Sequence, residues 1–506
     1  MSPRACRGAA VIVPDSQTPV IIAGGGPVGL SLALGLARQG VRSIIFEQAA
    51  ELPPFPRAIV VLTRTLEVFQ SWDVADAFRA RGEFVQTVRP VSALTNKQLI
   101  AIDFSQLADE TPSAGVIVLP QETTEKLLLQ ELRRTGMCEV RFNYKLIGAT
   151  QDESGVAVAV AGENGETQEV RARFLVGADG AHSAVRAAMG LALEGMTYPA
   201  HVFLADVGIA DERDNLPWPR VVAGERPRGA IRFEPGRWRV IGSLSPEQAE
   251  GTLPQAFLGE VVRETIGSGP YTLLWHSTFT IHRRHAKTFR KGRMLLAGDA
   301  GHLNSPAGGQ GMNAGIQDAH NLAWKLAFAL RGGNVDLLLD SYDAERHQAI
   351  TEGVERLTEV LTRFGLLMPK AMRNPIGAIL RRALSFRVFA NRLVRAASML
   401  NTGYWRSPLF LGKSSLLGKR APQPELLVKY TPTLVLHRPS PDVLAAAHDL
   451  GIPDVEVVRA HDWRRWRCAL PFAALVRPDG VVGSFHRNPS GESVHNGARG
   501  ALGFPT

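Results

Sequence analysis

The sequence predicts an α/β protein whose main domain is built on a largely parallel sheet, and three short apolar runs carry this prediction. Val20–Ala23 is followed by a glycine-rich turn and by an apolar helical segment. Ser43–Phe46 comes next, so the chain opens as a strand, a helix and a second strand. The third run, residues 294–297, lies far along the chain and again precedes a loop and a helix. A helix that connects two strands joins them in parallel within one sheet.

The composition is that of a globular protein of two or three domains. The chain has 506 residues, of which 45% are hydrophobic and 21% are charged. Its three cysteines, Cys6, Cys138 and Cys468, are far apart, so the sequence predicts neither a disulfide framework nor a metal site. Residues 16–37 carry no charge, but their pattern is that of a buried strand, a turn and a helix rather than a membrane span. The apolar run 9–13 is too short for a signal peptide, and we expect a cytoplasmic protein.

The net charge of +9 comes largely from one region, because residues 360–424 contain no Asp or Glu. This basic stretch, which has a helical pattern, predicts a solvated or inter-subunit surface, and a homodimer would fit it. Attachment to a membrane surface is the main alternative. No motif supports nucleic-acid binding. The basic residues include Arg363, Lys370, Arg373, Arg381, Arg382, Arg387, Arg392 and Arg395.

Other segments divide the chain further. Residues 127–134 have a helical pattern, and residues 156–160 and 169–176 are expected as further strands of the parallel sheet. Residues 198–204, 229–233 and 238–244 alternate like strands and predict an inserted antiparallel sheet. Residues 407–424 have the composition of a linker. In the segment that follows, two apolar runs flank the turn formed by Arg477, Pro478, Asp479 and Gly480, which predicts a hairpin.

The first motif that carries chemistry is the turn after Val20–Ala23. Gly24, Gly26 and Gly29 form GxGxxG, in which the glycines permit the turn, the approach of a pyrophosphate and close helix packing. Glu47 ends the next strand at nearly the spacing at which a carboxylate accepts from an adenosine ribose. The pattern predicts dinucleotide binding, and a purely structural turn would not explain Glu47.

Two further motifs end strands in the same way. Asp179 and Gly180 follow residues 174–178, where Asp179 is either part of a cofactor site or simply the cap of a helix that leaves Arg186 on the surface. Gly298 and Asp299 follow residues 294–297. After Pro306, a glycine-rich segment begins a helix, and such a helix start favours an anion.

Together these motifs resemble the class A flavin monooxygenases, the aromatic hydroxylases of the p-hydroxybenzoate, phenol and polyketide hydroxylase type. The resemblance covers about residues 19–345 and includes GGGPVG at Gly24, the DG pair at Asp179, the GD pair at Asp299, PRA at residues 56–58, and Gln121. It implies a Rossmann-like FAD-binding domain of the GR2 type with an inserted antiparallel substrate sheet, a helical region and a thioredoxin-like C-terminal domain that lacks CxxC.

The resemblance also implies roles for individual residues. Glu47 would hold the FAD ribose, Arg57 the pyrophosphate side, and Gln121 and Asp299 the ribityl chain. The backbone of the turn at Gly311 would face the N1 and C2 carbonyl edge of the isoalloxazine. The full set of implied cofactor-binding residues is Gly24, Gly26, Val28, Gly29, Glu47, Arg57, Gln121, Asp179, Asp299, Gly311, Met312 and Asn313.

The implied chemistry is reduction of FAD by NADPH or NADH, formation of a flavin C4a-hydroperoxide with O₂, and hydroxylation of a phenolic or polycyclic aromatic substrate. Baeyer–Villiger insertion or epoxidation by the same flavin is one alternative, and a non-catalytic flavin-binding interaction module is another. The implied FAD-binding domain comprises residues 18–85, 110–197 and 283–355, and the substrate sheet residues 86–109 and 198–282. A basic helical region (356–406), a linker (407–424) and the thioredoxin-like domain (425–506) follow.

The inserted sheet is expected to present an apolar surface to the aromatic ligand, although packing in the core is the simpler interpretation of the same residues. That surface consists of Ile231, Phe233, Trp238 and Val240, with Arg228, Arg232, Arg237 and Arg239 on the opposite faces. No catalytic residue is assigned: the four candidates for a base are Tyr198, His201, His276 and His282, and the sequence does not rank them.

Overall fold

The computed structural model describes residues 19–54, 58–223, 226–245, 248, 253–306, 308–363, 382, 387–401, 403–452, 456–459 and 462–506. Arg57, Lys370, Arg373 and Arg381 of the sequence predictions lie outside these residues.

A six-stranded sheet forms the centre of the molecule, with the strand order β19-β20-β13-β1-β2-β9. Its strands are parallel except β19, which pairs antiparallel with β20. The predicted parallel sheet is therefore present. The strands are β1 (Val20–Ala23), β2 (Ser43–Phe46), β9 (Cys138–Arg141), β13 (Phe174–Gly177), β19 (Arg290–Lys291) and β20 (Met294–Leu296).

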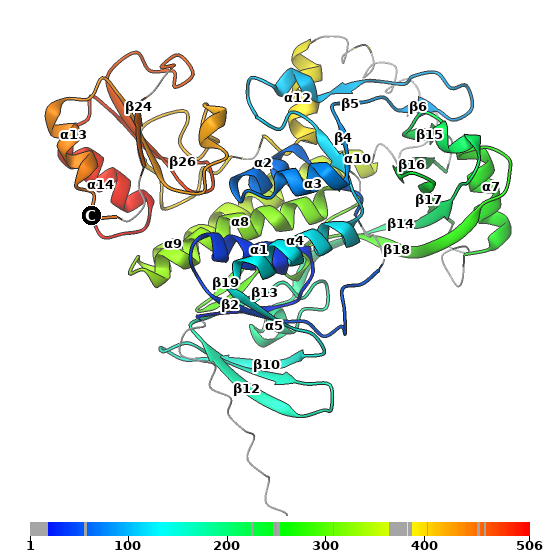
Figure 1. Cartoon of the computed structure of the whole chain (residues 1–506), viewed down its shortest axis with the longest axis horizontal. Coiled ribbons are helices and arrows are strands. Elements are labelled where there is room, and N and C mark those ends of the chain that lie inside the picture. Colours follow the sequence, from blue (N-terminus) through cyan, green and yellow to red (C-terminus); the bar gives the residue numbers. More distant parts are fainter. Residues whose placement is uncertain are drawn as a thin grey trace, which may run out of the picture.

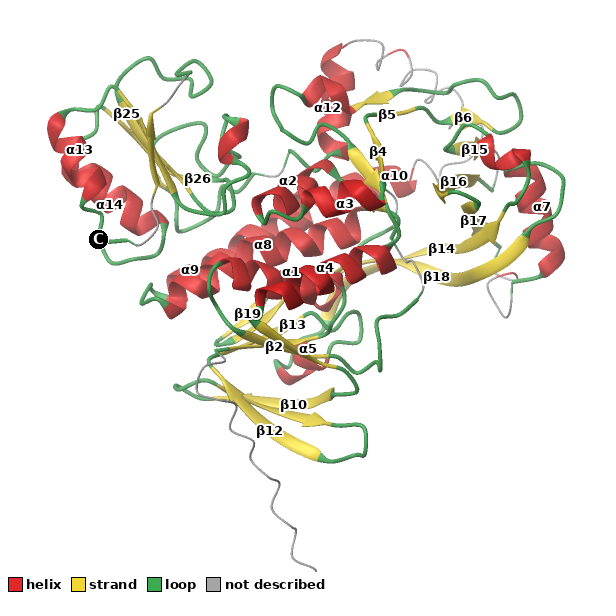
Figure 2. Ribbon diagram, in the orientation of Figure 1, coloured by secondary structure: helices red, strands yellow, loops and turns green. Residues whose placement is uncertain are grey.

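Helices cover one face of this sheet, as Figures 1 and 2 show. The long helix α8 (Gln310–Leu330) packs on α1 (Pro27–Arg38), and α1 also contacts α4 (Gln121–Thr135). Nearly every side chain of α8 is buried, including the polar ones, so this helix is the axis of the helical layer. Helices α2 (Thr63–Ser71), α3 (Ala75–Arg81) and α9 (Val335–Gln348) complete the layer.

A second, three-stranded antiparallel sheet lies beyond the other face, next to α5 (Ala184–Ala188) (Figure 1). It consists of β10 (Lys145–Gln151), β11 (Val156–Ala161) and β12 (Thr167–Ala172). The prediction that residues 156–160 and 169–176 extend the parallel sheet was right for residues 174–176, which belong to β13, and wrong for residues 156–160 and 169–172. The chain between β12 and β13 changes sheets at Arg173, whose N–H bonds to the Pro19 carbonyl, so one continuous segment supplies strands to both sheets.

The inserted antiparallel sheet has seven strands in the order β21-β18-β14-β17-β16-β15-β6. Its long centre is the pair β14 (Leu193–Gly208) and β18 (Thr272–Ala286), and α7 (Gln255–Thr265) covers one face. The remaining strands are β6 (Val91–Ser92), β15 (Arg220–Val222), β16 (Arg228–Glu234), β17 (Arg237–Leu244) and β21 (His302–Leu303).

The expected single apolar surface on this sheet was wrong. The β16–β17 register pairs Ile231 with Arg239 and Ala230 with Val240, so Ile231 and Val240 point to opposite faces. Trp238 and Val240 pack beneath α7, whereas Ile231 and Phe233 face a cluster that contains Ile59 and Val118. The predicted alternation of inward and outward side chains holds within each strand. The register of the β16–β17 hairpin, however, decides which side chains of the two strands share a face of the sheet.

The C-terminal unit is a five-stranded mixed sheet in the order β22-β26-β25-β23-β24, with helices α13 (Pro441–His448) and α14 (Gly491–Ala501). The predicted hairpin is formed by β25 (Phe472–Val476) and β26 (Val482–Arg487), and Gly480 in its turn has a φ of 75°. The other strands are β22 (Leu411–Gly412), β23 (Thr433–His437) and β24 (Glu456–Arg459).

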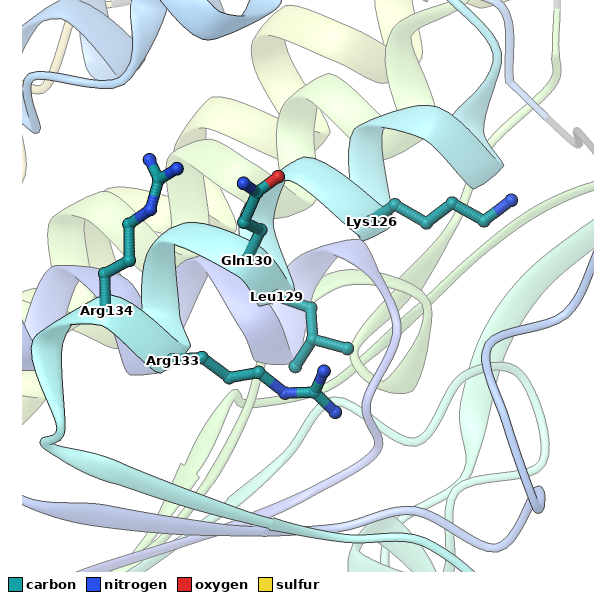
Figure 3. Close-up of a pocket in the computed structure, with 5 residues that line it drawn as sticks. All are labelled: Lys126, Leu129, Gln130, Arg133 and Arg134. Carbon is teal, nitrogen blue, oxygen red and sulfur yellow. The ribbon is translucent and has the colours of Figure 1, made fainter.

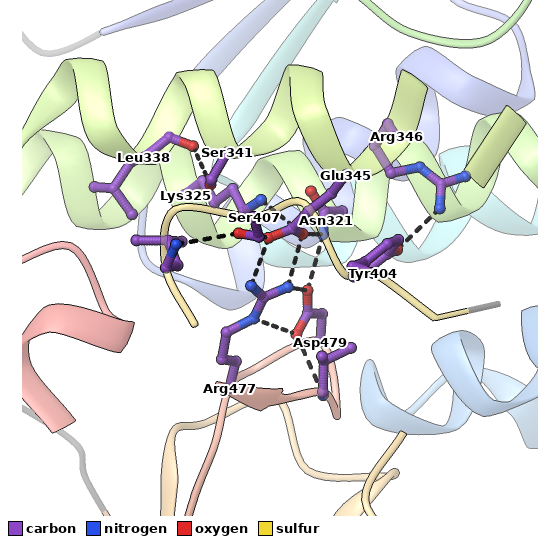
Figure 4. A network of polar contacts seen from close by, with 12 residues as sticks. Asn321, Lys325, Leu338, Ser341, Glu345, Arg346, Tyr404, Ser407, Arg477 and Asp479 are labelled. Atoms are coloured by element: carbon purple, nitrogen blue, oxygen red, sulfur yellow. Dashed lines mark hydrogen bonds and ion pairs between the residues drawn. The ribbon is translucent and has the colours of Figure 1, made fainter. Parts of the chain in front are cut away.

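The turn of this hairpin is buried against α8 and α9 (Figure 4). Arg477 donates to both carboxylate oxygens of Glu345 in α9, at 2.6 and 2.8 Å, and Asn321 of α8 donates to Asp479 at 2.9 Å. Lys325 of α8 also contacts Glu345, at 2.9 Å. The C-terminal unit is thus joined to the helical layer by charged side chains that are fully buried.

Part of the basic region is described. Helix α12 (Arg387–Ala397) follows α10 (Glu355–Thr362) in the chain, and Arg395 of α12 forms an ion pair with Glu110. Arg363 pairs with Glu359 at 2.6 Å. Among the described residues, no helix is long and apolar enough to cross a membrane.

Candidate functional site

The GxGxxG turn connects β1 to α1. Gly24 has a φ of 101°, which favours glycine, and an added Cβ at Gly29 would collide with the Gly24 carbonyl. Gly26 caps α1 and receives no side-chain cap, so the first N–H groups of this helix point out of the turn. A Cβ at Gly26 would meet no atom of the described chain within 4 Å. The turn therefore needs Gly24 and Gly29 for its own fold, whereas Gly26 borders open space next to a helix N-terminus.

Glu47 lies just beyond β2 and beside this turn. Its Oε2 accepts from the Gly25 N–H at 2.6 Å and its Oε1 accepts from the Ala49 N–H at 2.8 Å. The side chain remains partly accessible. The carboxylate is therefore fixed at the carboxyl end of β2, where a parallel sheet binds its ligands.

The turn at Gly298 and Asp299 packs directly against the first motif. It forms the short helix η3 (Gly298–Ala300) after β20, and Gly298 has a φ of 60°. Val28 of α1 fills the space in front of it: a Cβ at Gly298 would come within 2.8 Å of the Val28 side chain, and one at Gly315 within 2.5 Å. Asp299 is exposed at the tip of the turn, in a place where its carboxylate is accessible to a ligand.

The Asp179 motif joins the same cluster through Arg186. Asp179 Oδ2 accepts from the N–H groups of Ala184 and Val185, at 2.7 and 3.2 Å, at the start of α5, whose N-cap residue is Ser183. Asp179 therefore binds the first N–H groups of a helix, as the helix-cap interpretation expects, and its role at the cofactor stays a prediction. Arg186 does not lie on the surface, because it donates to the Ala300 carbonyl of the Asp299 turn at 3.0 Å. Asp179 Oδ1 is buried and has no hydrogen-bond partner among the described residues.

The first turns of α8 pack against the turn at Gly298 and Asp299, because a Cβ at Gly315 would come within 3.1 Å of the Gly298 Cα. Gly309, with a φ of 64°, caps the helix without a side-chain hydrogen bond. Gly311 would accept a Cβ without contact to any described atom within 4 Å, and Met312 is partly buried. The Asn313 side chain is fully used, because it accepts from the Leu62 N–H at 2.9 Å and donates to Val60 and Gly309. Asn313 can contact a ligand through its backbone.

Gln121 begins α4 and holds the neighbouring segment. Its side-chain oxygen accepts from the Ala58 N–H at 3.1 Å, and its side-chain nitrogen donates to Glu125 at 2.8 Å. Because Ala58 follows Arg57 in the chain, Gln121 ties the second half of the PRA segment to α4. The side chain is partly accessible, so it has room for a further contact.

The inserted sheet presents a second face away from α7. Strand register places Leu204, Ile241 and Phe279 on this face, together with Trp275. Arg239 is also here, but it forms a bidentate pair with Asp206 at 2.7 and 2.9 Å, with both side chains almost fully buried. Trp275 and Phe233 each lie 5.6 Å from its guanidinium.

Of the four candidate bases, Tyr198 belongs to the apolar cluster on this face of the sheet. It packs with Val202, Ile281 and Phe279, and its hydroxyl is buried with no hydrogen-bond partner among the described residues. Burial raises the pKa of Tyr198. Its hydroxyl is therefore a neutral donor at physiological pH, available to a polar group of a ligand.

A buried network behind the Asp299 turn was missed by the sequence analysis. Asp318, His302 and Arg346 form it, and all three side chains are buried. An Asp in the middle of a helix that has an apolar face was the available signal, since a buried carboxylate requires partners. Its neighbours are far apart in sequence, which hides them from pattern analysis.

One surface hollow lies elsewhere. It follows the exposed side of α4 and is lined by the exposed side chains of Lys126, Gln130, Arg133 and Arg134 and by the buried Leu129 (Figure 3). It contains none of the predicted site residues. Among the described residues, no cluster of His, Cys, Asp or Glu could hold a metal ion.

The converged motifs fit FAD. The Gly24 turn borders Asp179, and Glu47 lies beside Gly25, while Val28 fills the space in front of Gly298 and Gly315. The chain leaves space at Gly26 and Gly311 where a Cβ would otherwise lie. Helix starts suit a pyrophosphate and an electron-rich ring edge, and carboxylates at strand ends suit hydroxyl groups.

Comparison with known proteins agrees with an FAD-binding site. A family model described as an FAD binding domain matches residues 17–357. The 12-dehydrotetracycline 5-monooxygenase/anhydrotetracycline 6-monooxygenase of Streptomyces rimosus subsp. rimosus is 33% identical over 426 residues, covering 81% of each chain.

Solved structures extend the likeness to nearly the whole chain. The OxyS anhydrotetracycline hydroxylase from Streptomyces rimosus is 29% identical, with a TM-score of 0.77 over 96% of this chain and 98% of that one. A ternary complex of aklavinone-11 hydroxylase with FAD and aklavinone shares the fold, at 24% identity and a TM-score of 0.81, over 97% of this chain and 100% of that one. The motifs, their convergence and these matches show that the chain belongs to the FAD-binding family of flavin-dependent aromatic hydroxylases.

Proposed function

We propose that this protein hydroxylates a neutral, phenolic polycyclic compound, with NADPH or NADH as reductant and dioxygen as the source of the oxygen atom. The single observation that carries the choice of substrate is the sheet face around Tyr198. It carries the apolar cluster of Tyr198, Val202 and Ile281, and the hydroxyls of Tyr198 and Ser243 on this face are buried without a hydrogen-bond partner among the described residues. The likeness to hydroxylases named for anhydrotetracycline supports the same choice.

The charge of the sheet favours a neutral substrate over a carboxylate. The four arginines of its β16–β17 hairpin are all engaged by carboxylates: Arg239 by Asp206, Arg232 by Asp214, Arg237 by Glu234 and Glu122, and Arg228 by Glu260 and Glu264. Freeing Arg239 from its buried pair with Asp206 would cost several kcal/mol, on the order of 3–5. The pairs of Arg228, Arg232 and Arg237 are partly exposed, so each costs less to break. A substrate carboxylate would have to displace an existing carboxylate partner at each of these four residues.

For the cofactor, we infer the following contacts. Gly24, Gly26, Val28 and Gly29 shape the turn that receives the pyrophosphate, and Arg57 neutralises it. Glu47 binds the ribose, whereas Gln121 and Asp299 bind the ribityl chain. The backbone at Gly311, Met312 and Asn313 faces the flavin edge, and Asp179 supports the site from the turn between β13 and α5.

When bound, FAD supplies the oxygen chemistry, and the chain's own residues provide position and electrostatics. The positive start of α8 favours negative charge at the ring edge that lies against it. The inserted sheet orients the aromatic ring and, together with it, excludes water. The Tyr198 hydroxyl hydrogen-bonds the phenolic oxygen of the substrate.

We also propose roles for the parts of the molecule outside the FAD-binding domain. Residues 86–109 and 198–282 form the substrate-binding unit, and residues 425–506 a supporting unit without redox function. The protein works in the cytoplasm, without nucleic acid, and the basic region offers a surface for a homodimer.

The test uses the purified protein and pairs of phenols that share a ring system and differ in a carboxylate. We expect neutral polycyclic phenols to stimulate NAD(P)H oxidation and to gain one oxygen atom by mass. Preference for the carboxylated partner would contradict the neutral-substrate proposal. Oxygen placed within a ring carbon–carbon bond, or across a double bond, would instead indicate Baeyer–Villiger insertion or epoxidation.

The role of Tyr198 has its own test. Tyr198→Phe removes the hydroxyl and leaves the ring, so we expect FAD affinity to stay unchanged while KM for a phenolic substrate rises about tenfold. An unchanged KM would show that the hydroxyl does not contact the substrate.

A further inference from the structure

The carboxylate of Asp318 lies at zero exposure in the middle of α8, and three contacts converge on it. Its Oδ2 accepts from the backbone N–H of Gly298 at 2.9 Å and lies 2.7 Å from His302 Nε2. Its Oδ1 accepts from Arg346 Nε at 2.6 Å. One side chain of α8 therefore holds both the Gly298–Asp299 turn and the strand that follows it.

The contacts continue away from the turn. Arg346 of α9 donates to the Tyr404 hydroxyl at 3.0 Å and to the Ala314 carbonyl of α8 at 3.2 Å. Tyr404 lies next to the docked hairpin, with its ring 6.0 Å from the Arg477 guanidinium. A buried chain of polar contacts thus leads from the C-terminal unit through Tyr404, Arg346 and Asp318 to Gly298.

The charge of Asp318 is maintained by its neighbours. Burial alone would raise the pKa of this carboxyl, but Arg346 and His302 outweigh burial and lower its pKa. Such a buried group adds little net stability compared with a well-packed apolar side chain. Its distinctive contribution is geometric, because Gly298 adopts a positive φ and its N–H must point at a fixed acceptor.

We propose that Asp318 is a positioning residue for FAD: it fixes the Gly298–Asp299 turn so that Asp299 faces the cofactor. Through Arg346 and Tyr404, this positioning also depends on the docked C-terminal unit. The inference rests on the proposed contact between Asp299 and FAD, and it does not depend on the substrate or on oxygen transfer.

The experiment is a double-mutant cycle read out as FAD affinity. Apoprotein of the full chain is titrated with FAD by fluorescence quenching for the wild type, Asp299→Ala, Asp318→Asn and the double variant. We expect Asp318→Asn to weaken FAD binding about tenfold, the effect of losing a hydrogen bond to a charged group. In the Asp299→Ala background the same substitution should change FAD affinity less than twofold, because the turn no longer carries a ligand group.

A general loss of structure would behave differently. Asp343 of α9 accepts from the Phe289 N–H at 2.6 Å and from the Thr288 hydroxyl at 2.8 Å, without contact to the turn. Asp343→Asn should therefore lower thermal stability and leave FAD affinity within twofold. The proposal would be overturned if the fold-losses of FAD affinity in Asp299→Ala and Asp318→Asn multiply in the double variant. An unchanged FAD affinity in Asp318→Asn would also overturn it.

Two further outcomes support or overturn the proposal. If Asp318→Asn does not fold, Tyr404→Phe replaces it in the cycle. A roughly threefold weakening of FAD binding that occurs only when Asp299 is present supports the proposal, and an unchanged FAD affinity overturns it. If Asp299→Ala binds FAD like the wild type, Asp318 cannot act through Asp299, and the inference fails while FAD-dependent hydroxylation stands.

Discussion

The guanidinium of Arg477 donates a hydrogen bond to each carboxylate oxygen of Glu345, at 2.6 and 2.8 Å, across the boundary between the C-terminal unit and the helical layer. Burial alone would raise the pKa of Glu345, but Arg477 and Lys325 outweigh it and keep the pKa far below the usual range. Burial lowers the pKa of Lys325 to about 8. The hairpin turn is therefore a fixed part of the enzyme's core.

Removing one partner of this pair should be costly. Arg477→Ala leaves the buried Glu345 with the charge of Lys325 and the neutral donors Asn321 and Ser407, and we expect a loss of about 3–5 kcal/mol in the free energy of unfolding. Chemical denaturation followed by circular dichroism measures it. Arg487→Ala, at an exposed position of the same hairpin, is the matched control and should change stability by less than about 0.5 kcal/mol. Similar losses of unfolding free energy in both variants would show that the contact between Arg477 and Glu345 does not stabilise the fold.

Two glycines of one turn should fail in different ways. Gly26→Ala adds a Cβ into open space, so the protein should keep its stability but lose FAD affinity by about tenfold or more. Gly29→Ala drives a Cβ into the Gly24 carbonyl, so stability itself should fall. Thermal melting without FAD, followed by FAD titration, separates the two effects. Wild-type FAD affinity in Gly26→Ala would place the pyrophosphate elsewhere.

The buried pair in the substrate sheet offers a test of that sheet alone. Asp206→Asn leaves the Arg239 guanidinium buried without its counter-charge, and we expect a loss of about 3 kcal/mol or more in stability. FAD affinity should remain within twofold, because neither residue belongs to the converged motifs. A large loss of FAD affinity in a folded Asp206→Asn protein would show that the sheet and the cofactor site are not separable in this way.

Stability should also fall in mild acid because of His320. This ring packs between Trp72 and Tyr430, and burial lowers its pKa well below the usual 6.5. Below pH 6.5 the unfolded chain takes up a proton that native His320 does not, so stability decreases by about 1.4 kcal/mol per pH unit from this group. Urea denaturation at pH about 7.5 and about 5.5 should show a smaller acid loss in His320→Gln than in the wild type.

The control for this measurement is His448→Gln, at an exposed position of α13. Its acid loss should equal that of the wild type. An equal acid loss in His320→Gln would mean that other groups account for the whole effect.

The sequence predicts this structure best where the determinants are local. Glycine turns, strand ends and the hairpin at Gly480 depend on neighbouring residues, and the structure contains all of them. The split of residues 169–176 into strands of two sheets, and the pairing of Ile231 with Arg239, depend on partners far away in the chain. The same reason hides the contact of Asp318 with Gly298, since no spacing rule connects a mid-helix carboxylate to a turn before that helix.

We expect this protein to transfer one atom of dioxygen to a phenolic ring with FAD as cofactor. To test this, the FAD-loaded protein is incubated with NADPH or NADH and a panel of neutral polycyclic phenols under isotopically labelled dioxygen, and the products are analysed by mass spectrometry. One labelled oxygen atom should appear in a ring hydroxyl of at least one compound. Bound FAD with all labelled oxygen recovered as hydrogen peroxide, or labelled product absent across the panel, would contradict it.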